Sequence, residues 1–295
     1  MTQAIQTAPL GHYRMKNVVR SEVVKILTLR STAVTLGITV AAALLVTGLV
    51  SNAALGHPAA WYVGFDPTQT SLTGLIVAGL TGGVFGALII TGEYSSGTIR
   101  SSLAATPRRS ILLRAKIGVT AAAVIAFCEV LSFASFLLGQ AILSGQPRPS
   151  AAALQESQGP GGPGGPGGSI LLGHLRTDAS LGSPGALRAV WMTGLFIALL
   201  ALMAFGLGLI FRSTAGAIAG FAGVTFVLPL VMRGISQHLD RYMPTNILVN
   251  SVMSTTNDHG GPYAPLSAPM GLLAMALYAL VALAVGAILF NERDA

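Results

Sequence analysis

The sequence predicts an all-α integral membrane protein with six transmembrane helices, both termini cytoplasmic, preceded by an amphipathic helix at the membrane interface. Three observations predict this fold class. Of the 295 residues, 52% are hydrophobic and only 9% are charged, whereas soluble domains carry about 25% charged residues. Apolar runs long enough to cross the hydrocarbon recur along the chain. The Lys and Arg residues gather beside these runs, mostly on one predicted side.

Residues 1–30 are expected to form a cytoplasmic N-terminus that contains the interfacial helix. Met15, Val19, Val23 and Ile26 follow one another at helical spacing, so they share one face. The basic residues of this segment lie mostly on other faces. Such a helix is typical of one that lies in the headgroup plane. A solvated helix that only supplies orienting charge is the alternative.

Residues 31–295 are expected to form a single six-helix transmembrane domain. About 20 apolar residues at 1.5 Å each span the hydrocarbon. The six predicted spans are 31–54, 71–91, 111–143, 188–211, 213–233 and 270–290. Residues 242–253 are half-apolar and too short to cross, which indicates a surface or re-entrant helix.

The distribution of positive charge predicts the topology. With six spans, twelve of the 17 Lys and Arg residues fall on the side of both termini, the 92–110 segment and the Arg212 turn. The positive-inside rule therefore places that side in the cytoplasm. The loops at 144–187 and 234–269 are then external. The first contains a Gly/Pro-rich run, which is typical of a flexible linker rather than a collagen helix.

Small residues at helical spacing indicate close helix packing within the second and fifth spans. The glycines expected to permit it are Gly79, Gly83, Gly86, Gly216 and Gly220.

Enzymatic chemistry is not predicted for this chain. It contains neither a G-x-x-x-x-G-K-[ST] phosphate loop nor an H-E-x-x-H metal motif. Its histidines are scattered, and the single cysteine, Cys128, cannot form an internal disulfide. We therefore expect no catalytic residue, metal or cofactor here. Basic residues beside apolar runs, without interleaved aromatics, favour anionic lipid headgroups over nucleic acid as the partner.

Glu129 is the one acidic residue deep within a predicted span. Ser132, Phe136 and Gln140 follow it on the same side of the helix. A charge exposed to lipid at the bilayer centre costs at least about 2.5–3.5 kcal/mol, so this face should point into the protein. Glu129 and Gln140 then line a translocation path, or Glu129 is a protonated or hydrogen-bonded residue that fixes helix packing. The sequence favours neither.

A compact polar segment at about 93–109 separates the second and third spans. The segment begins with Glu93, Gly97 is expected to break the helix of the second span, and Pro107 is expected to end a short half-apolar helix. Such a helix suits a groove on a partner protein. The alternative is a plain cytoplasmic loop whose arginines only orient the protein.

The run from Gly92 to Arg109, with the Leu113–Lys116 start of the next span, resembles the stretch after the second helix of bacterial type-2 ATP-binding-cassette exporter permeases. The resemblance implies that residues 93–109 form a coupling helix docked on a separate ATPase. It also implies an interfacial connecting helix at 12–30 and short external helices at 236–269. The loop at 144–187 is longer than the resemblance leads one to expect.

The resemblance implies a permease subunit of an exporter in the bacterial cytoplasmic membrane, carrying a lipid-like, drug-like or other small substrate. Two copies of the ATPase would hold ATP and Mg, and a second permease, identical or a sister chain, would complete the path. The residues expected to transmit movement are Glu93, Tyr94, Gly97, Thr98, Ile99 and Arg100. The alternative is a proton-coupled secondary transporter using Glu129, which leaves the 93–109 segment unexplained.

Overall fold

The computed structural model describes residues 15–28, 30–55, 65–105, 109–145, 179–255 and 264–292, and over these ranges it contains helices and no strand. Six helical segments in them are long and apolar enough to cross a membrane. The six predicted spans are therefore confirmed. The segments are Arg30–Leu55, Pro67–Ser95, Ser110–Ser144, Ala186–Phe211, Thr214–Ile235 and Ala268–Glu292.

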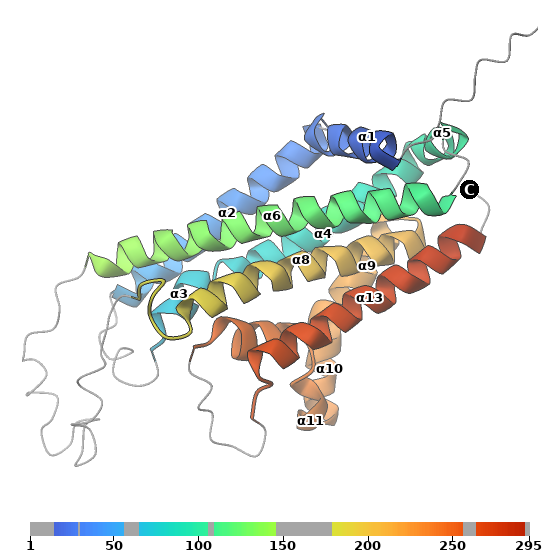
Figure 1. Cartoon of the computed structure of the whole chain (residues 1–295). Coiled ribbons are helices and arrows are strands. Elements are labelled where there is room, and N and C mark those ends of the chain that lie inside the picture. The colour runs from blue at the N-terminus through green and yellow to red at the C-terminus, as the bar shows by residue number, and fades with distance from the viewer. Residues whose placement is uncertain are drawn as a thin grey trace, which may run out of the picture.

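The helices are arranged as a bundle with short helices at both ends (Figure 1). Its first half contains α1 (Met15–Thr28), α2 (Arg30–Leu55), α3 (Pro67–Leu72), α4 (Leu75–Ser95), α5 (Thr98–Ala105) and α6 (Arg109–Ser144). Its second half contains α8 (Ala186–Phe211), α9 (Thr214–Ala222), η4 (Gly223–Val227), α10 (Leu228–Ile235), α11 (Gln237–Asp240), α12 (Pro244–Asn246), η5 (Ile247–Met253) and α13 (Ala268–Glu292).

The helix α8 lies at the centre of the bundle. Of its most apolar 18-residue stretch, 72% is buried, against 17% for α2. It packs against α4, α13 and α6, and Phe196 and Phe205 are fully buried in it. A helix that is apolar on every side belongs in such a position. The other spans leave much of their surface free to face lipid.

The second span begins earlier than predicted. The sequence indicates 71–91, whereas the structure has helix over most of Pro67–Ser95. Asp66 explains the early start, because its Oδ1 accepts a hydrogen bond from the Thr68 backbone N–H at 2.9 Å and caps α3. Its Oδ2 accepts from the backbone N–H and the hydroxyl of Thr255, at 2.8 and 2.6 Å.

The fifth span changes register near Pro229. Helix α9 passes into the π-helical η4 before α10 begins, and Pro229 lies in the first turn of α10. Proline has no N–H to donate to the preceding turn, and a π segment accommodates an unpaired carbonyl. The span therefore continues through Pro229 as a helix.

The half-apolar segment at 242–253 is helical from Pro244 onward and folded against the end of the bundle. Its buried residues include Ile247, Val252 and Met253, and it packs against α8 and α13. Arg188 donates hydrogen bonds to the carbonyls of Ser251 and Ser254 at 3.4 and 2.7 Å. The segment is thus a short packed element that does not cross the bundle.

Several predictions from sequence concern residues outside the described ranges. These include the N-terminal residues 1–14, residues 56–64, Pro107 and Arg108, most of the predicted loop at 144–187 with its Gly/Pro-rich run, residues 256–263, and 293–295.

Candidate coupling site

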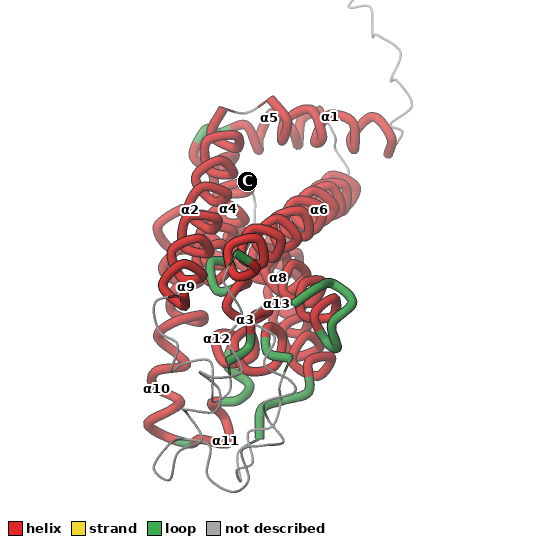
Figure 2. The backbone as a smooth tube through the Cα atoms, turned by 90° about the vertical axis from the view of Figure 1, so that its left-hand side faces the viewer, coloured by secondary structure: helices red, strands yellow, loops and turns green. Residues whose placement is uncertain are grey.

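The polar segment after the second span contains the short helix α5. Gly97, with φ at +71°, makes the turn from α4 into it, a conformation that glycine adopts without steric cost. Helix α5 lies across the end of the bundle, next to α1 (Figure 2). We call this the α5 end. The turn between α8 and α9 and the end of α13 lie at the same end (Figure 1). That this end faces the cytoplasm stays a prediction.

Helix α5 is amphipathic, and its apolar face is fixed to the bundle. Ile99 is 3% exposed. It lies in a cluster with Ile90 of α4, Leu113 of α6, Phe205 of α8 and Phe290 of α13. The opposite face of α5 is open, with Thr98, Arg100 and Ser101 exposed. One residue of α5 thus belongs to an apolar cluster that is shared by four spans.

Four charged residues, Glu22, Lys25, Glu93 and Lys116, meet beside α5; we call them the charged quartet. Lys116 Nζ lies 2.6 Å from Glu22 Oε2 and 2.6 Å from Glu93 Oε1. Lys25 Nζ lies 3.0 Å from Glu22 Oε1 and 3.3 Å from Glu93 Oε1. Two cations and two anions alternate in this arrangement, so the quartet has no formal net charge. It joins α1, α4 and α6 through charges rather than through apolar packing.

The quartet is largely removed from solvent. The side chains of Lys116 and Glu22 are 3% and 5% exposed. Breaking such a pair by deleting one partner leaves a buried charge uncompensated, which costs about 3–5 kcal/mol. Lys25 lies at the edge of the quartet. Burial lowers the pKa of Lys25, but the charges of Glu93 and Glu22 and their hydrogen bonds outweigh burial and raise it above its ordinary value.

One hydrogen bond connects the quartet to α5 itself. Lys25 Nζ donates to Ser102 Oγ at 3.3 Å. Ser102 is half-buried on α5, on the side that faces α1. Helix α5 is therefore held by apolar contacts through Ile99 and by a polar contact through Ser102.

A cavity of about 420 Å³ opens beside the quartet, between α1, α2, α4 and α5. Its walls combine the quartet with hydroxyls such as Thr32 and Thr35 and apolar residues such as Phe85. Glu93 Oε2 is buried there and has no hydrogen-bond partner within the described ranges. The cavity is thus polar near α5 and apolar deeper in the bundle.

Tyr94 connects the end of α4 to the turn between α8 and α9. The Arg212 guanidinium carbon lies 5.5 Å from the centre of the Tyr94 ring, within range of a cation–π interaction. Arg212 adopts φ of 53° at the end of α8 and donates to the Leu289 carbonyl of α13 at 3.4 Å. The ends of α4, α8 and α13 are thereby connected.

The six residues predicted for coupling divide into two groups. Glu93, Tyr94 and Ile99 face the bundle and its connections, whereas Gly97, Thr98 and Arg100 are exposed. Sequence reasoning missed the residues that complete the site, which are Glu22, Lys25, Ser102 and Lys116. The available signal was that Glu22, the only acidic residue of α1, lies three positions before Lys25.

The structure does not bring Glu129 and Gln140 together. They are 11 positions apart on α6, or about 16 Å along a helix. Glu129 is 9% exposed, and its carboxyl group packs so closely on Gly194 of α8 that a Cβ there would lie 2.8 Å from Glu129 Cδ. Ser132 donates to the Val190 carbonyl at 2.7 Å.

Gln140 lies at the end of the bundle opposite α5, and its amide is shared among protein groups. Its Nε2 donates to the Pro67 carbonyl at 3.0 Å and to Ser71 Oγ at 2.9 Å. Its Oε1 accepts from the Ala179 N–H at 2.6 Å. These bonds join α6, α3 and the segment before α8, so Gln140 supports the fold at that end.

The predicted packing glycines have identifiable neighbours. A Cβ on Gly83 would collide with the ring of Phe221, and one on Gly86 with the carbonyl of Ala201. A Cβ on Gly79 would lie 3.2 Å from Leu200 Cδ1. Gly216 faces Ser213 at the start of α9, and Gly220 faces Phe211 at the end of α8. Sequence reasoning missed Gly194, Gly206, Gly208 and Gly286, which also lie at close helix contacts.

Metal-ligating side chains do not gather in the part of the chain that the structure describes. There, no group of three or more His, Cys, Asp or Glu residues is placed to hold a metal ion. The arrangement at the α5 end is mechanical and electrostatic. It connects a small exposed helix to several spans.

Comparison with known proteins gives one family. No curated protein matches this chain. The sequence profile described as ABC-2 family transporter protein matches residues 15–295. Members of this family are membrane components of transporters that work with an ATP-binding-cassette ATPase and are not themselves catalytic. Together with its six apolar helices, this match shows that the chain is a multi-pass membrane protein and belongs to the ABC-2 transporter family.

Proposed function

We propose that this chain is the permease subunit of an exporter in the cytoplasmic membrane and that α5 is the helix on which the ATPase acts. One observation carries the proposal. Helix α5 presents an open polar face with Thr98 and Arg100, while its other face is fixed to the bundle by Ile99 and Ser102. A helix that only connected two spans would need neither the exposed face nor both attachments.

Movement of α5 reaches the spans by two routes in this proposal. The apolar route runs through Ile99 into the cluster shared by α4, α6, α8 and α13. The polar route runs through Ser102 and Lys25 into the charged quartet, which couples α1 to α4 and α6. Closure of two ATPases on ATP then tilts the spans of two permease copies, and the path between them opens outward.

The substrate is proposed to be small, lipid-like or drug-like. Two cavities, one of about 420 Å³ beside the quartet and one of about 510 Å³ between α8 and α13, fall within the range of small-molecule sites. Glu129 is proposed to lie on the path, since its Oε2 is buried without a hydrogen-bond partner in the described ranges. Family membership favours ATP over a proton gradient as the driving force, so the secondary-transporter alternative is not the function we propose.

The test is co-expression with the ATP-binding-cassette ATPase from a neighbouring reading frame. We expect the two proteins to purify together and substrate-stimulated ATP hydrolysis in liposomes. Arg100→Glu should weaken both, because the substitution reverses the charge on the exposed face of α5. Arg30→Glu is the matched control, since Arg30 is also exposed but lies at the start of α2. Unchanged co-purification and hydrolysis with Arg100→Glu would remove α5 as the docking helix. Export driven by a pH gradient without ATP would instead support the alternative.

A further inference from the structure

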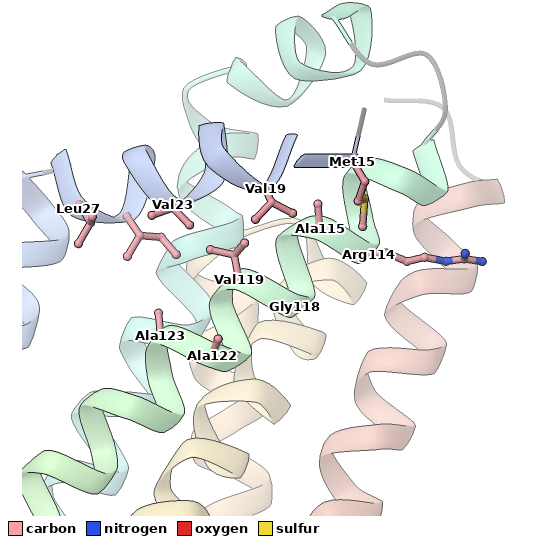
Figure 3. A pocket seen from close by; sticks show the side chains of 11 residues that line it. Met15, Val19, Val23, Leu27, Arg114, Ala115, Gly118, Val119, Ala122 and Ala123 are labelled. Carbon is pink, nitrogen blue, oxygen red and sulfur yellow. The ribbon is translucent and has the colours of Figure 1, made fainter. Parts of the chain in front are cut away.

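A further cavity lies between α1 and α6. It is a groove of about 440 Å³. One wall is the apolar face predicted for the N-terminal helix, and the other is the first half of α6 (Figure 3). The groove-lining residues on which the argument depends are Val19, Val23, Leu27, Arg114, Gly118 and Ala122.

The groove remains open because the two helices diverge. They are joined on one side by Val18, which packs against Leu112 and Ala115. Beyond this contact α6 descends away from α1, and the side chains of Val19 and Val23 project into the space between them (Figure 3). Leu27 is 77% exposed and Val23 is 38% exposed. Helix α1 crosses the ends of the spans, and this much exposed apolar surface on it indicates that an apolar ligand binds in the groove.

The charges around the groove indicate what polar group the ligand carries. Arg114 is exposed on α6, one helical turn above Gly118, and Lys16 and Arg20 are exposed on α1. Within the described ranges no carboxylate forms an ion pair with any of these three cations. The two acidic residues nearby, Glu22 and Glu93, are both engaged by lysines of the quartet. Arg114 is therefore a cation in the wall of the groove, and Lys16 and Arg20 add positive charge on neighbouring turns of α1.

We propose that the groove binds one anionic glycerophospholipid of the surrounding membrane. An acyl chain lies between α1 and α6, along Gly118 and Ala122, and the phosphate is held at Arg114. An apolar tail with an anionic head matches both the apolar walls and the neighbouring cations. A lipid held there fills the wedge between the interfacial helix and the third span, so it supports the angle at which α1 crosses the bundle.

The test is lipid retention. The chain is reconstituted in nanodiscs of equal phosphatidylglycerol and phosphatidylcholine, extracted in mild detergent, and examined by native mass spectrometry. We expect about one phosphatidylglycerol to be retained per chain, in preference to phosphatidylcholine. Gly118→Leu should abolish retention, because a Cβ at Gly118 meets no atom within 4 Å and the new side chain fills the groove. Gly37→Leu is the matched control, since Gly37 is equally open but lies on α2.

Arg114→Gln keeps the test decisive should Gly118→Leu fail to fold. It should lower the preference for phosphatidylglycerol about fivefold, the effect of one cation near a lipid surface, while Arg30→Gln leaves the preference unchanged. Absence of retained phospholipid, equal retention of both lipids by the unmodified chain, or unchanged retention in Gly118→Leu would each overturn the proposal. A loss of dimer with unchanged lipid in Gly118→Leu would also overturn it, since a second copy of the chain would then fill the groove.

Discussion

Lys116 Nζ lies 2.6 Å from Glu22 Oε2, which joins the third span to the helix that precedes the first span. The two residues are 94 positions apart, and both side chains are almost fully buried. A buried ion pair contributes little net stability over an apolar pair of the same shape, but it is costly to break. The pair therefore acts chiefly as a constraint on where α1 lies against α6.

Replacing Lys116 with Met should be strongly destabilising. The substitution keeps the length of the side chain but leaves Glu22 and Glu93 facing each other with only Lys25 to compensate. The expected loss is about 3–5 kcal/mol. Thermal unfolding of the purified chain in nanodiscs measures it.

Two variants separate lost charge compensation from lost packing. Lys25→Met should cost only about 1 kcal/mol, because the Lys25 side chain is 36% exposed and its pairs are screened by solvent. Glu22→Met combined with Lys116→Met should be more stable than Lys116→Met alone, since the Glu93–Lys25 pair remains. A double variant that is less stable than Lys116→Met would show that packing, not charge, dominates at this position.

The spans could be predicted from sequence because each is a local property. Twenty apolar residues in a row identify a spanning helix without knowledge of its neighbours. The amphipathic face of α1 was also visible, because Met15, Val19, Val23 and Ile26 follow helical spacing. Boundaries were less accurate where a polar residue caps the helix, as Asp66 does.

The partners within the site could not be predicted in this way. Nothing local in the sequence pairs Glu22 with Lys116, and charge counts assigned Lys25 and Lys116 only to a membrane side. Likewise, the glycine spacing indicated close packing but could not name Phe221 as the neighbour of Gly83. Gln140 shares a helix face with Glu129, yet its position along the helix places it among the groups at the opposite end.

Gly97→Ala and Gly92→Ala should have opposite effects on stability. Neither new Cβ would meet an atom within 4 Å, so backbone conformation decides the sign. Gly97 has φ of +71°, where an L-residue costs about 1–2 kcal/mol. Gly92 lies within α4, where alanine is favoured over glycine by about 1 kcal/mol.

The two variants should also differ in how strongly substrate stimulates ATP hydrolysis. Gly97→Ala alters the turn that orients α5, so we expect lower substrate-stimulated ATP hydrolysis in the reconstituted complex, with basal hydrolysis unchanged. Gly92→Ala should leave stimulation intact. Equal stimulation in both variants would mean that the turn at Gly97 does not set the position of α5.

The pH dependence of stability should carry a contribution from Lys25. The pKa of Lys25 is raised in the folded chain, so its contribution is fully present below the ordinary lysine pKa of 10.5 and is lost as pH rises through the higher folded pKa. The unfolding temperature should therefore fall less steeply above about pH 10 in Lys25→Gln than in the unmodified chain. If the unfolding temperature fell equally steeply with pH in both proteins, Lys25 would not contribute to the pH dependence of stability.

Alanine at the packing glycines should be destabilising, most at Gly86, less at Gly83 and least at Gly79. A Cβ at Gly86 meets the backbone carbonyl of Ala201, which cannot move without shifting α8. At Gly83 it meets only the far end of the Phe221 ring, and at Gly79 the tip of Leu200. Overpacking costs about 1–3 kcal/mol. Phe221→Leu should partly rescue Gly83→Ala in thermal unfolding and should not rescue Gly86→Ala.

Asp66 should be the residue whose loss loosens the end of the bundle opposite α5. Its Oδ1 caps α3, and its Oδ2 holds Thr255, so one side chain fixes both the start of the second span and the segment after η5. Asp66→Asn keeps an oxygen for the cap but turns an amide N–H₂ toward the Thr255 N–H, so it loses that acceptor. Asp66→Ala loses both functions, with about 1 kcal/mol assigned to the cap and about 1.5–3 kcal/mol to the charge-assisted bonds.

Hydrogen exchange separates the two roles of Asp66. Asp66→Asn should expose the amides around Thr255 while α3 stays protected, and Asp66→Ala should expose both. Equal exchange in the two variants would show that the cap and the bond to Thr255 form a single cooperative unit, in which neither half survives without the other.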